Sequence, residues 1–211
     1  PKDLSAENLK NYDAVYLNNS TSIEKGLTTE KMREEFIEYV KNGGGIVAIH
    51  AATDGGWPGY TEMIGGNFDG HPWGHEGTYC LCNEDSTHPV VSGIFGGKQS
   101  FEINDELYQY KDFDREKVRV LLSIDMSKFE NHRGGRKRED NDYAMAWVKS
   151  FGKGKIFVSS PGHNHHIYWN KDILKMWYQG FRFVLGELEV DTESIPKPSF
   201  SLPPAAGEQV P

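Results

Sequence analysis

The sequence predicts an α/β fold whose central sheet is mostly parallel and carries additional antiparallel strands. Three observations lead to this prediction: a strand, helix, strand unit near the N-terminus, a later group of strands without long helices between them, and an amphipathic helix near residue 180. A chain of 211 residues is long enough for one sizeable hydrophobic core.

The first unit consists of a short apolar strand at 13–18, an amphipathic helix and a buried strand at 46–49. Thr28 is placed to cap the helix, and the glycines at 43–45 end it. The continuous apolar run at 46–49 is typical of a parallel strand that is covered on both faces. Ligands of such sheets lie beyond the carboxyl ends of the strands, which directs attention to residues 50–54.

Further strands are expected at 78–82, 101–103, 118–124, 143–148 and 155–160, with a tight turn at 152–154. These segments lie close together in the sequence, so part of the sheet is expected to be antiparallel. The last element is a helix that Asn170 caps and that presents a broad apolar face. We expect one domain over residues 1–190 and a Pro-rich extended tail or linker over 191–211.

The composition excludes several classes of function. The chain has 23 Lys and Arg against 31 Asp and Glu, a net charge of -8, which disfavours a nucleic acid or an anionic membrane as the main partner. The basic stretch at 133–138 is expected to be a solvated loop. No apolar run is long enough to cross a bilayer. Cys80 and Cys82 share one face of a strand and are poorly placed for an ordinary disulfide.

Histidines gather in three loops at or near strand ends: His50 after the second strand, His71 and His75 in a Gly- and Trp-rich loop, and His163, His165 and His166 after a later strand. Imidazole serves near neutral pH as an acid, a base or a metal ligand. If the loops converge, His50, His71 and His163 could hold a divalent metal such as zinc, together with a carboxylate. The spacing matches no compact metal motif, so an ordinary hydrogen-bonded role stays open for each histidine.

Carboxylates and aromatic rings accompany these histidines. Asp54 lies four residues beyond His50, and Glu106 and Tyr108 follow a predicted strand. Such groups suit proton transfer on a sugar or a carbonyl compound. Asp105 is expected to be a cap or a surface charge. Trp57 offers a face on which a pyranose ring could stack, although a loop aromatic is equally often part of the core.

A nucleophilic triad is disfavoured, because the sequence has no G-x-S-x-G motif and neither cysteine lies at a strand-to-helix turn. The position of an elbow nucleophile, directly after 46–49, is occupied by His50.

Five motifs together resemble the ThuA-like (trehalose utilization) family, and the resemblance extends from about residue 12 to residue 188. These motifs are GGGIVAIHAATD at 43–54, His71-Pro72, His88-Pro89, FEINDELY at 101–108, and AWVKSFGKGKIF at 146–157 followed by Gly162-His163.

The resemblance implies a flavodoxin-like three-layer α/β sandwich similar to class I glutamine amidotransferases, with His50 in place of their cysteine and without their activity. It also implies a role in the breakdown of trehalose or related disaccharides through 3-keto sugars. The recurrent polar residues of the family would fall on His50, Asp54, His71, Glu106, Tyr108 and His163. Such folds begin with a further strand and helix, which this sequence is expected to lack.

The leading hypothesis is an enzyme, a lyase, isomerase or hydrolase, in which His50, Glu106 and His163 carry out acid/base or metal-assisted chemistry on a keto-glycoside. Asp54, Trp57, His71, Tyr108 and His165 would bind the sugar. The alternatives are a non-catalytic sugar-binding or accessory domain and a metal-dependent hydrolase. No certain cofactor follows from the sequence, and a homo-oligomer stays open. The absence of an initial Met and the Pro-rich tail favour the periplasm or the exterior over the cytoplasm.

Overall fold

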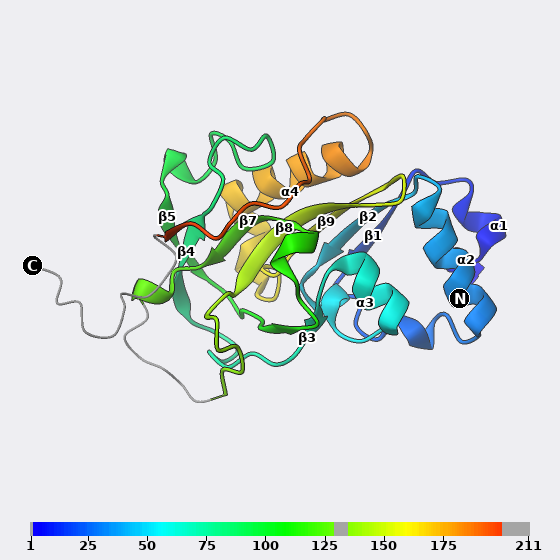
Figure 1. The fold of residues 1–211 in the computed structure, drawn as a ribbon, viewed down its shortest axis with the longest axis horizontal. Coiled ribbons are helices and arrows are strands. Elements are labelled where there is room, and N and C mark those ends of the chain that lie inside the picture. Colours follow the sequence, from blue (N-terminus) through cyan, green and yellow to red (C-terminus); the bar gives the residue numbers. More distant parts are fainter. Residues whose placement is uncertain (1, 129–134, 200–211) are drawn as a thin grey trace, which may run out of the picture.

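The computed structural model describes residues 2–128 and 135–199 (Figure 1). A seven-stranded sheet crosses the molecule in the order β1-β2-β9-β8-β7-β4-β5, and β3 and β6 form a separate two-stranded ribbon. The strands are β1 (Ala14–Asn18), β2 (Gly45–Ile49), β3 (Asn67–Phe68), β4 (Thr78–Asn83), β5 (Ser100–Asn104), β6 (Tyr110–Lys111), β7 (Arg119–Ile124), β8 (Ala144–Phe151) and β9 (Gly154–Ser159).

The sheet has a parallel half and an antiparallel half. β2 pairs in parallel with both β1 and β9, whereas β9, β8, β7, β4 and β5 pair with one another in antiparallel fashion. The predicted α/β class with additional antiparallel strands is therefore confirmed, and the antiparallel part is larger than expected. Its size follows from short connections such as the turn at Gly152, where φ is +61°, because only antiparallel neighbours can be joined so tightly.

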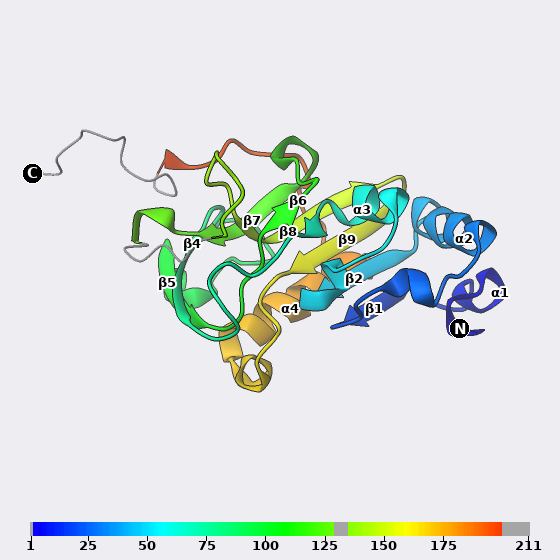
Figure 2. The same ribbon diagram turned by 90° about the horizontal axis from the view of Figure 1, so that it is seen from below.

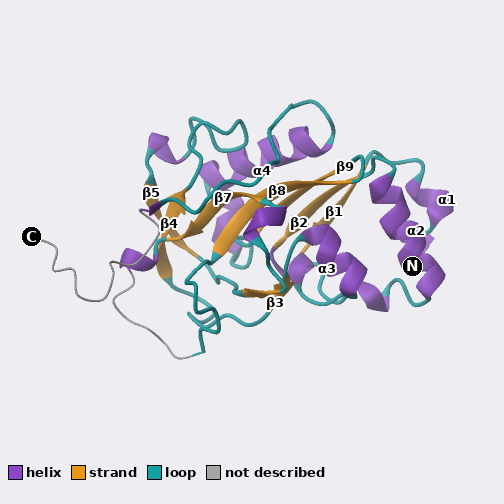
Figure 3. Ribbon diagram, viewed as in Figure 1, coloured by secondary structure: helices purple, strands orange, loops and turns teal. Residues whose placement is uncertain are grey.

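Helices cover both faces of the sheet. The long helix α4 packs against β9 and β2 on one face, and α2 and α3 lie on the other, which gives three layers (Figures 2 and 3). Strand β2 between them is buried along its whole length. The helices are α1 (Ala6–Leu9), α2 (Glu30–Lys41), α3 (Pro58–Ile64) and α4 (Lys171–Val184).

The helix ends show where local sequence signals are reliable. Asn170 caps α4 as predicted, since its side chain accepts hydrogen bonds from the amides of Asp172 and Ile173. The predicted cap of α2 was one residue early: Thr29, not Thr28, accepts from the amide of Met32. Helix α3 was not predicted, although it begins with a proline and ends at a glycine with φ of +97°.

The C-terminal segment lies along the fold as far as it is described. Asp191 accepts a hydrogen bond from Arg119 at 3.2 Å, and Lys197 donates to the carbonyl of Asn141 at 2.6 Å. Residues 200–211 of the predicted tail, and residues 133 and 134 of the predicted basic loop, lie outside the described residues.

The described residues include no helix with the length and apolar character of a membrane span. The thiols of Cys80 and Cys82 are both free, as their shared strand face predicts.

A buried ion network ties three loops of the antiparallel half together. Arg115 bonds Glu84 at 2.6 Å and Asp142 at 2.6 Å, and its two terminal nitrogens reach both oxygens of Glu84. The side chains are 13%, 0% and 8% exposed respectively. Buried charges are stable only beside partners of opposite charge, so removal of the guanidinium would leave Glu84 without this partner and Asp142 with Lys197 at 3.7 Å.

We therefore expect Arg115→Met to lower the free energy of unfolding by about 3 kcal/mol, because buried Glu84 loses its two hydrogen bonds from the guanidinium and Asp142 keeps the longer contact with Lys197, at 3.7 Å. The measurement is urea denaturation at neutral pH. Lys117→Met, two residues away at an exposed position paired with Asp114, is the control and should change stability by less than about 1 kcal/mol. Equal losses in the two variants would contradict a special role for the Arg115 network.

Candidate functional site

The site forms where the neighbouring parallel strands β2 and β9 end at one edge of the sheet. His50 directly follows β2, and residues 160–163 directly follow β9. The two chain segments approach closely at Gly162, where a Cβ atom would lie 2.4 Å from Cγ2 of Ile49. Glycine at this position therefore lets the loop that carries His163 reach the end of β2.

His50 is held in an unusual backbone conformation. Its φ is +50°, a left-handed value that is uncommon for a residue with a side chain, and Thr53 Oγ1 donates to its carbonyl at 2.8 Å. The ring is 1% exposed, and its Nδ1 lies 2.7 Å from the carbonyl oxygen of Ser160. Because a carbonyl only accepts, Nδ1 carries the hydrogen and Nε2 faces the interior of the site.

Glu106 reaches the site from the far edge of the sheet. The segment after β5 crosses the ends of the intervening strands and closes with the β3–β6 ribbon. Asp105 holds this segment in place: it is fully buried and accepts hydrogen bonds from the amides of Gly162, His163 and Asn164 at 2.6, 3.2 and 2.7 Å. Asp105 thereby positions Glu106 and the His163 loop relative to each other.

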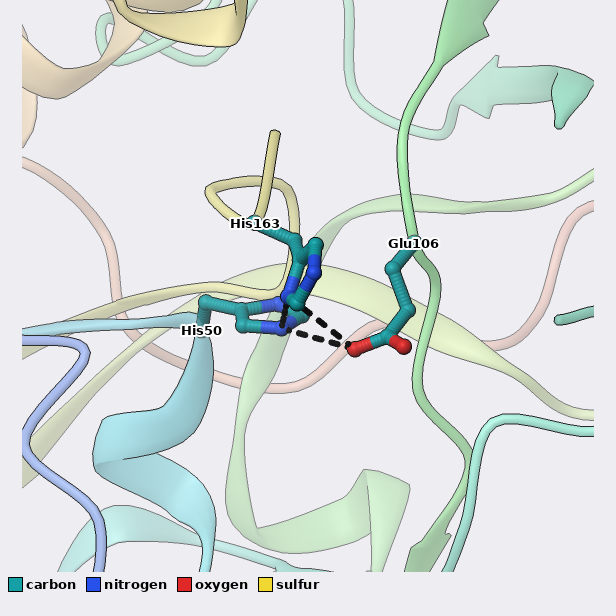
Figure 4. A group of neighbouring side chains, drawn as sticks. All are labelled: His50, Glu106 and His163. Atoms are coloured by element: carbon teal, nitrogen blue, oxygen red, sulfur yellow. Dashed lines mark hydrogen bonds and ion pairs between the residues drawn. The ribbon is translucent and has the colours of Figure 1, made fainter. Parts of the chain in front are cut away.

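Three side-chain atoms meet at this point (Figure 4). His50 Nε2 lies 3.1 Å from Oε2 of Glu106, and His163 Nδ1 lies 3.1 Å from His50 Nε2 and 3.3 Å from the same oxygen. His50 and Glu106 are buried, whereas 42% of the His163 side chain is exposed. The cluster thus consists of two buried side chains, His50 and Glu106, and one imidazole, that of His163, which solvent reaches.

The loop between β3 and β4 contributes two more imidazoles, which lie near the other carboxylate oxygen of Glu106, Oε1. His75 Nδ1 lies 2.6 Å from Oε1, and His71 Nδ1 lies 3.8 Å from it. The two rings pack against each other with centroids 4.4 Å apart. Glu106 is therefore a single carboxylate surrounded by four histidines.

This surrounding decides the charge of Glu106. Burial by itself would raise the pKa of its carboxyl, but the hydrogen bonds from His50 and His75 and the charges of His163 and His71 outweigh burial and lower the pKa to about 2. At neutral pH Glu106 is a carboxylate, so it can accept hydrogen bonds or bind a cation.

Tyr108 forms one wall of the site. Its ring lies over that of His50 with centroids 3.9 Å apart, and its backbone amide donates to Ser160 Oγ at 3.3 Å. Burial and, next, the charge of Glu106 raise the pKa of the Tyr108 phenol, which therefore stays protonated.

The other predicted sugar-binding residues lie around this centre or away from it. Asp54 accepts a hydrogen bond from Thr21 at 2.8 Å in the loop after β1. Trp57 packs against α2, with the guanidinium of Arg33 5.5 Å from its ring centre. His165 is exposed, and its ring contacts that of His166.

The structure also changes the predicted grouping of metal ligands. Among the described residues, His50 and His163 group with Glu106, and His71 groups with His75 and Glu106. His50, His71 and His163 therefore lie around one carboxylate, with His71 on the other oxygen of Glu106 from His50 and His163.

Two contributors were missed by sequence reasoning. His75 was not assigned a role, although its position four residues after His71 in the same loop was a usable signal. Asp105 was expected to be a cap or a surface charge. It is not a surface charge, because it is fully buried, and it accepts hydrogen bonds from three successive backbone amides of a distant loop, as a capping carboxylate does within one segment. The hydrogen-bond partners of Asp105 lie more than 50 residues away in the sequence, and no local sequence pattern predicts such contacts.

We expect Asp105→Asn to lower the free energy of unfolding by about 2 kcal/mol, because one of the two acceptor oxygens becomes an NH2 group, which faces a backbone N–H group of residues 162–164 with a donor. The NMR signals of the His163 ring should shift in the same variant. Glu102→Gln, an exposed carboxylate on β5, makes the same chemical change as a control and should leave both quantities nearly unchanged. An unshifted His163 in Asp105→Asn would contradict the positioning role.

Comparison with known proteins assigns the chain to a family. A family model described as ThuA, trehalose utilisation, matches residues 1–184. No curated protein matches the chain. Among solved structures, a ThuA-like protein from Bacteroides uniformis is 25% identical with a TM-score of 0.68, covering 86% of this chain and 73% of that one.

Two further structures share the fold. A ThuA-like protein from Parabacteroides merdae is 20% identical with a TM-score of 0.62, covering 89% of this chain and 79% of its own. A cytoplasmic protein from Salmonella typhimurium is 18% identical with a TM-score of 0.56, covering 85% and 74%. The resemblance seen in the sequence is thus confirmed, and the chain belongs to the ThuA, or trehalose utilisation, family.

Proposed function

We propose that this chain acts in the breakdown of trehalose or a related disaccharide, on a sugar that carries a 3-keto group. The observation that supports this proposal is the convergence of His50, Glu106 and His163 at one edge of the sheet of a ThuA-family protein. Groups that accept and donate protons side by side suit chemistry next to a carbonyl group.

The chemistry follows from the keto group. A carbonyl at C3 acidifies the hydrogen on C2, so a base can remove that proton and the electron pair can form a C1–C2 double bond. The C1–O bond to the second sugar then breaks, and an acid supplies the proton that its oxygen needs. Atoms and charges balance without an oxidant or reductant. Addition of water to the double bond would complete a net hydrolysis.

The exposures suggest how the residues share this work. His163 is the member of the triangle that a sugar can reach, so it is the group proposed to exchange a proton with the substrate. Glu106 and His50 lie beneath it and hold the charge that His163 gains or loses. His71 and His75, at the rim, are placed to contact sugar hydroxyl groups.

A second candidate function is sugar binding without catalysis. The observation in its favour is Trp169, which is 78% exposed at the end of the same loop region that carries His163. An exposed indole is a surface on which a pyranose ring can stack. This candidate predicts sugar affinity that does not depend on His163.

Proton NMR of the chain with 3-keto-trehalose in deuterated buffer separates these candidates. We expect exchange of the C2 hydrogen or new sugar products, and at least a 100-fold slower rate in His163→Ala, the order of magnitude of lost acid/base catalysis. The same spectra with trehalose itself should not change, because it lacks the acidifying carbonyl.

Glu102→Gln serves as the matched control and should retain the rate. Unchanged spectra of 3-keto-trehalose with the unmodified chain would contradict the enzymatic proposal and, if the sugar still binds, favour the binding domain. A rate that a chelator abolishes would assign the reaction to metal-assisted chemistry, including the hydrolase that uses a metal-activated water.

A further inference from the structure

The three contacts in the centre of the site cannot all be hydrogen bonds. His50 Nε2, Glu106 Oε2 and His163 Nδ1 form a triangle with sides of 3.1, 3.1 and 3.3 Å, so each atom contacts both others. Each atom is either a donor or an acceptor. With three members, at least one contact must therefore join two donors or two acceptors, which is unfavourable in a buried place.

A cation resolves this conflict because it attracts all three atoms at once. Neutral imidazole nitrogen and carboxylate oxygen are ligands for zinc and similar first-row metals. We propose that His50 Nε2, Glu106 Oε2 and His163 Nδ1 bind one divalent transition-metal ion, with a fourth position open to water or substrate.

The size of the triangle fits such an ion. Zinc lies about 2.0–2.1 Å from nitrogen and about 2.0–2.2 Å from oxygen ligands, so two ligands of a tetrahedral zinc are about 3.3 Å apart. The three measured separations of 3.1, 3.1 and 3.3 Å are close to this edge length. Two histidines and a glutamate with one open position are also a donor set of catalytic zinc sites.

The surroundings of the triangle have the features of a metal site. His50 Nδ1 donates to the Ser160 carbonyl at 2.7 Å, which fixes the tautomer whose Nε2 can bind a metal. His75 Nδ1 lies 2.6 Å from Oε1, the oxygen of Glu106 that the triangle does not use, and so orients the carboxylate. Asp105 holds the amides of residues 162–164 and thereby the His163 loop.

The second possible group fits a metal less well. His75 is at direct hydrogen-bonding distance from Glu106, and His71 lies 3.8 Å from the same oxygen, so the two separations differ strongly. His75 is also the most exposed of the four histidines around Glu106, with 75% of its side chain exposed. The inference therefore assigns His75 to orienting Glu106 and His163 to binding the ion.

The inference rests on the proposed function only for the use of the metal, which would polarise the 3-keto oxygen of the sugar. With the ion bound, His163 would hold the metal and would no longer exchange the proton itself. Binding of the ion is tested without any sugar. If zinc binds and 3-keto-trehalose does not react, the proposed function fails and the metal site stands. If zinc does not bind and the sugar still reacts, the metal site fails and the proposed function stands.

The experiment uses the chain after treatment with a chelator and its removal, titrated with zinc by calorimetry and checked by elemental analysis. We expect one zinc per chain and a rise in melting temperature on loading. His163→Ala should bind zinc at least 100-fold more weakly and lose the rise in melting temperature, whereas His75→Ala should lose about 10-fold, as outer partners of metal ligands do.

His165→Ala is the matched control, since it removes an exposed imidazole two residues from His163 and should leave zinc affinity unchanged. Because His163 is partly exposed, its replacement is compatible with folding, which the melting temperature of the metal-free variant verifies. Cobalt(II) gives a second readout, a visible absorption band that His163→Ala should lose. No bound zinc in the unmodified chain, or equal affinity in His163→Ala and His165→Ala, would overturn the proposal.

Discussion

The ionised carboxylate of Glu106 is the interaction on which the arrangement of the site depends. It is buried, and one oxygen faces His50 and His163 while the other faces His71 and His75. A buried carboxylate is stable only with such partners. The contacts with this carboxylate therefore hold three loops from different parts of the chain together, at the ends of the parallel strands.

A second buried carboxylate, Asp105, fixes the position of one of these loops. Asp105 accepts hydrogen bonds from three backbone amides of the loop after β9, and these bonds stabilise its buried side chain. Adjacent residues in the sequence thus divide two tasks: Asp105 fixes the backbone of the His163 loop, and Glu106 fixes the rings. The left-handed backbone at His50 completes the arrangement from the β2 side.

Local sequence signals predicted most of the elements that support the site. The apolar run at 46–49 and the cap at Asn170 correspond to β2 and α4, and the ends of β2 and β9 bring His50 and His163 together as expected. The path of residues 105–111 across the sheet could not be predicted, because its contacts are with distant loops. For the same reason Asp105 was misjudged, and Trp57, an aromatic that suits either a sugar or a core, lies against α2.

The most direct test of the central claim is the position of the proposed ion. X-ray diffraction from crystals grown with zinc, measured on both sides of the zinc absorption edge, locates it independently of any assay. The account predicts one anomalous peak about 2.0–2.2 Å from His50 Nε2, Glu106 Oε2 and His163 Nδ1. A peak between His71 and His75 instead, or an intact triangle without a peak, would contradict it.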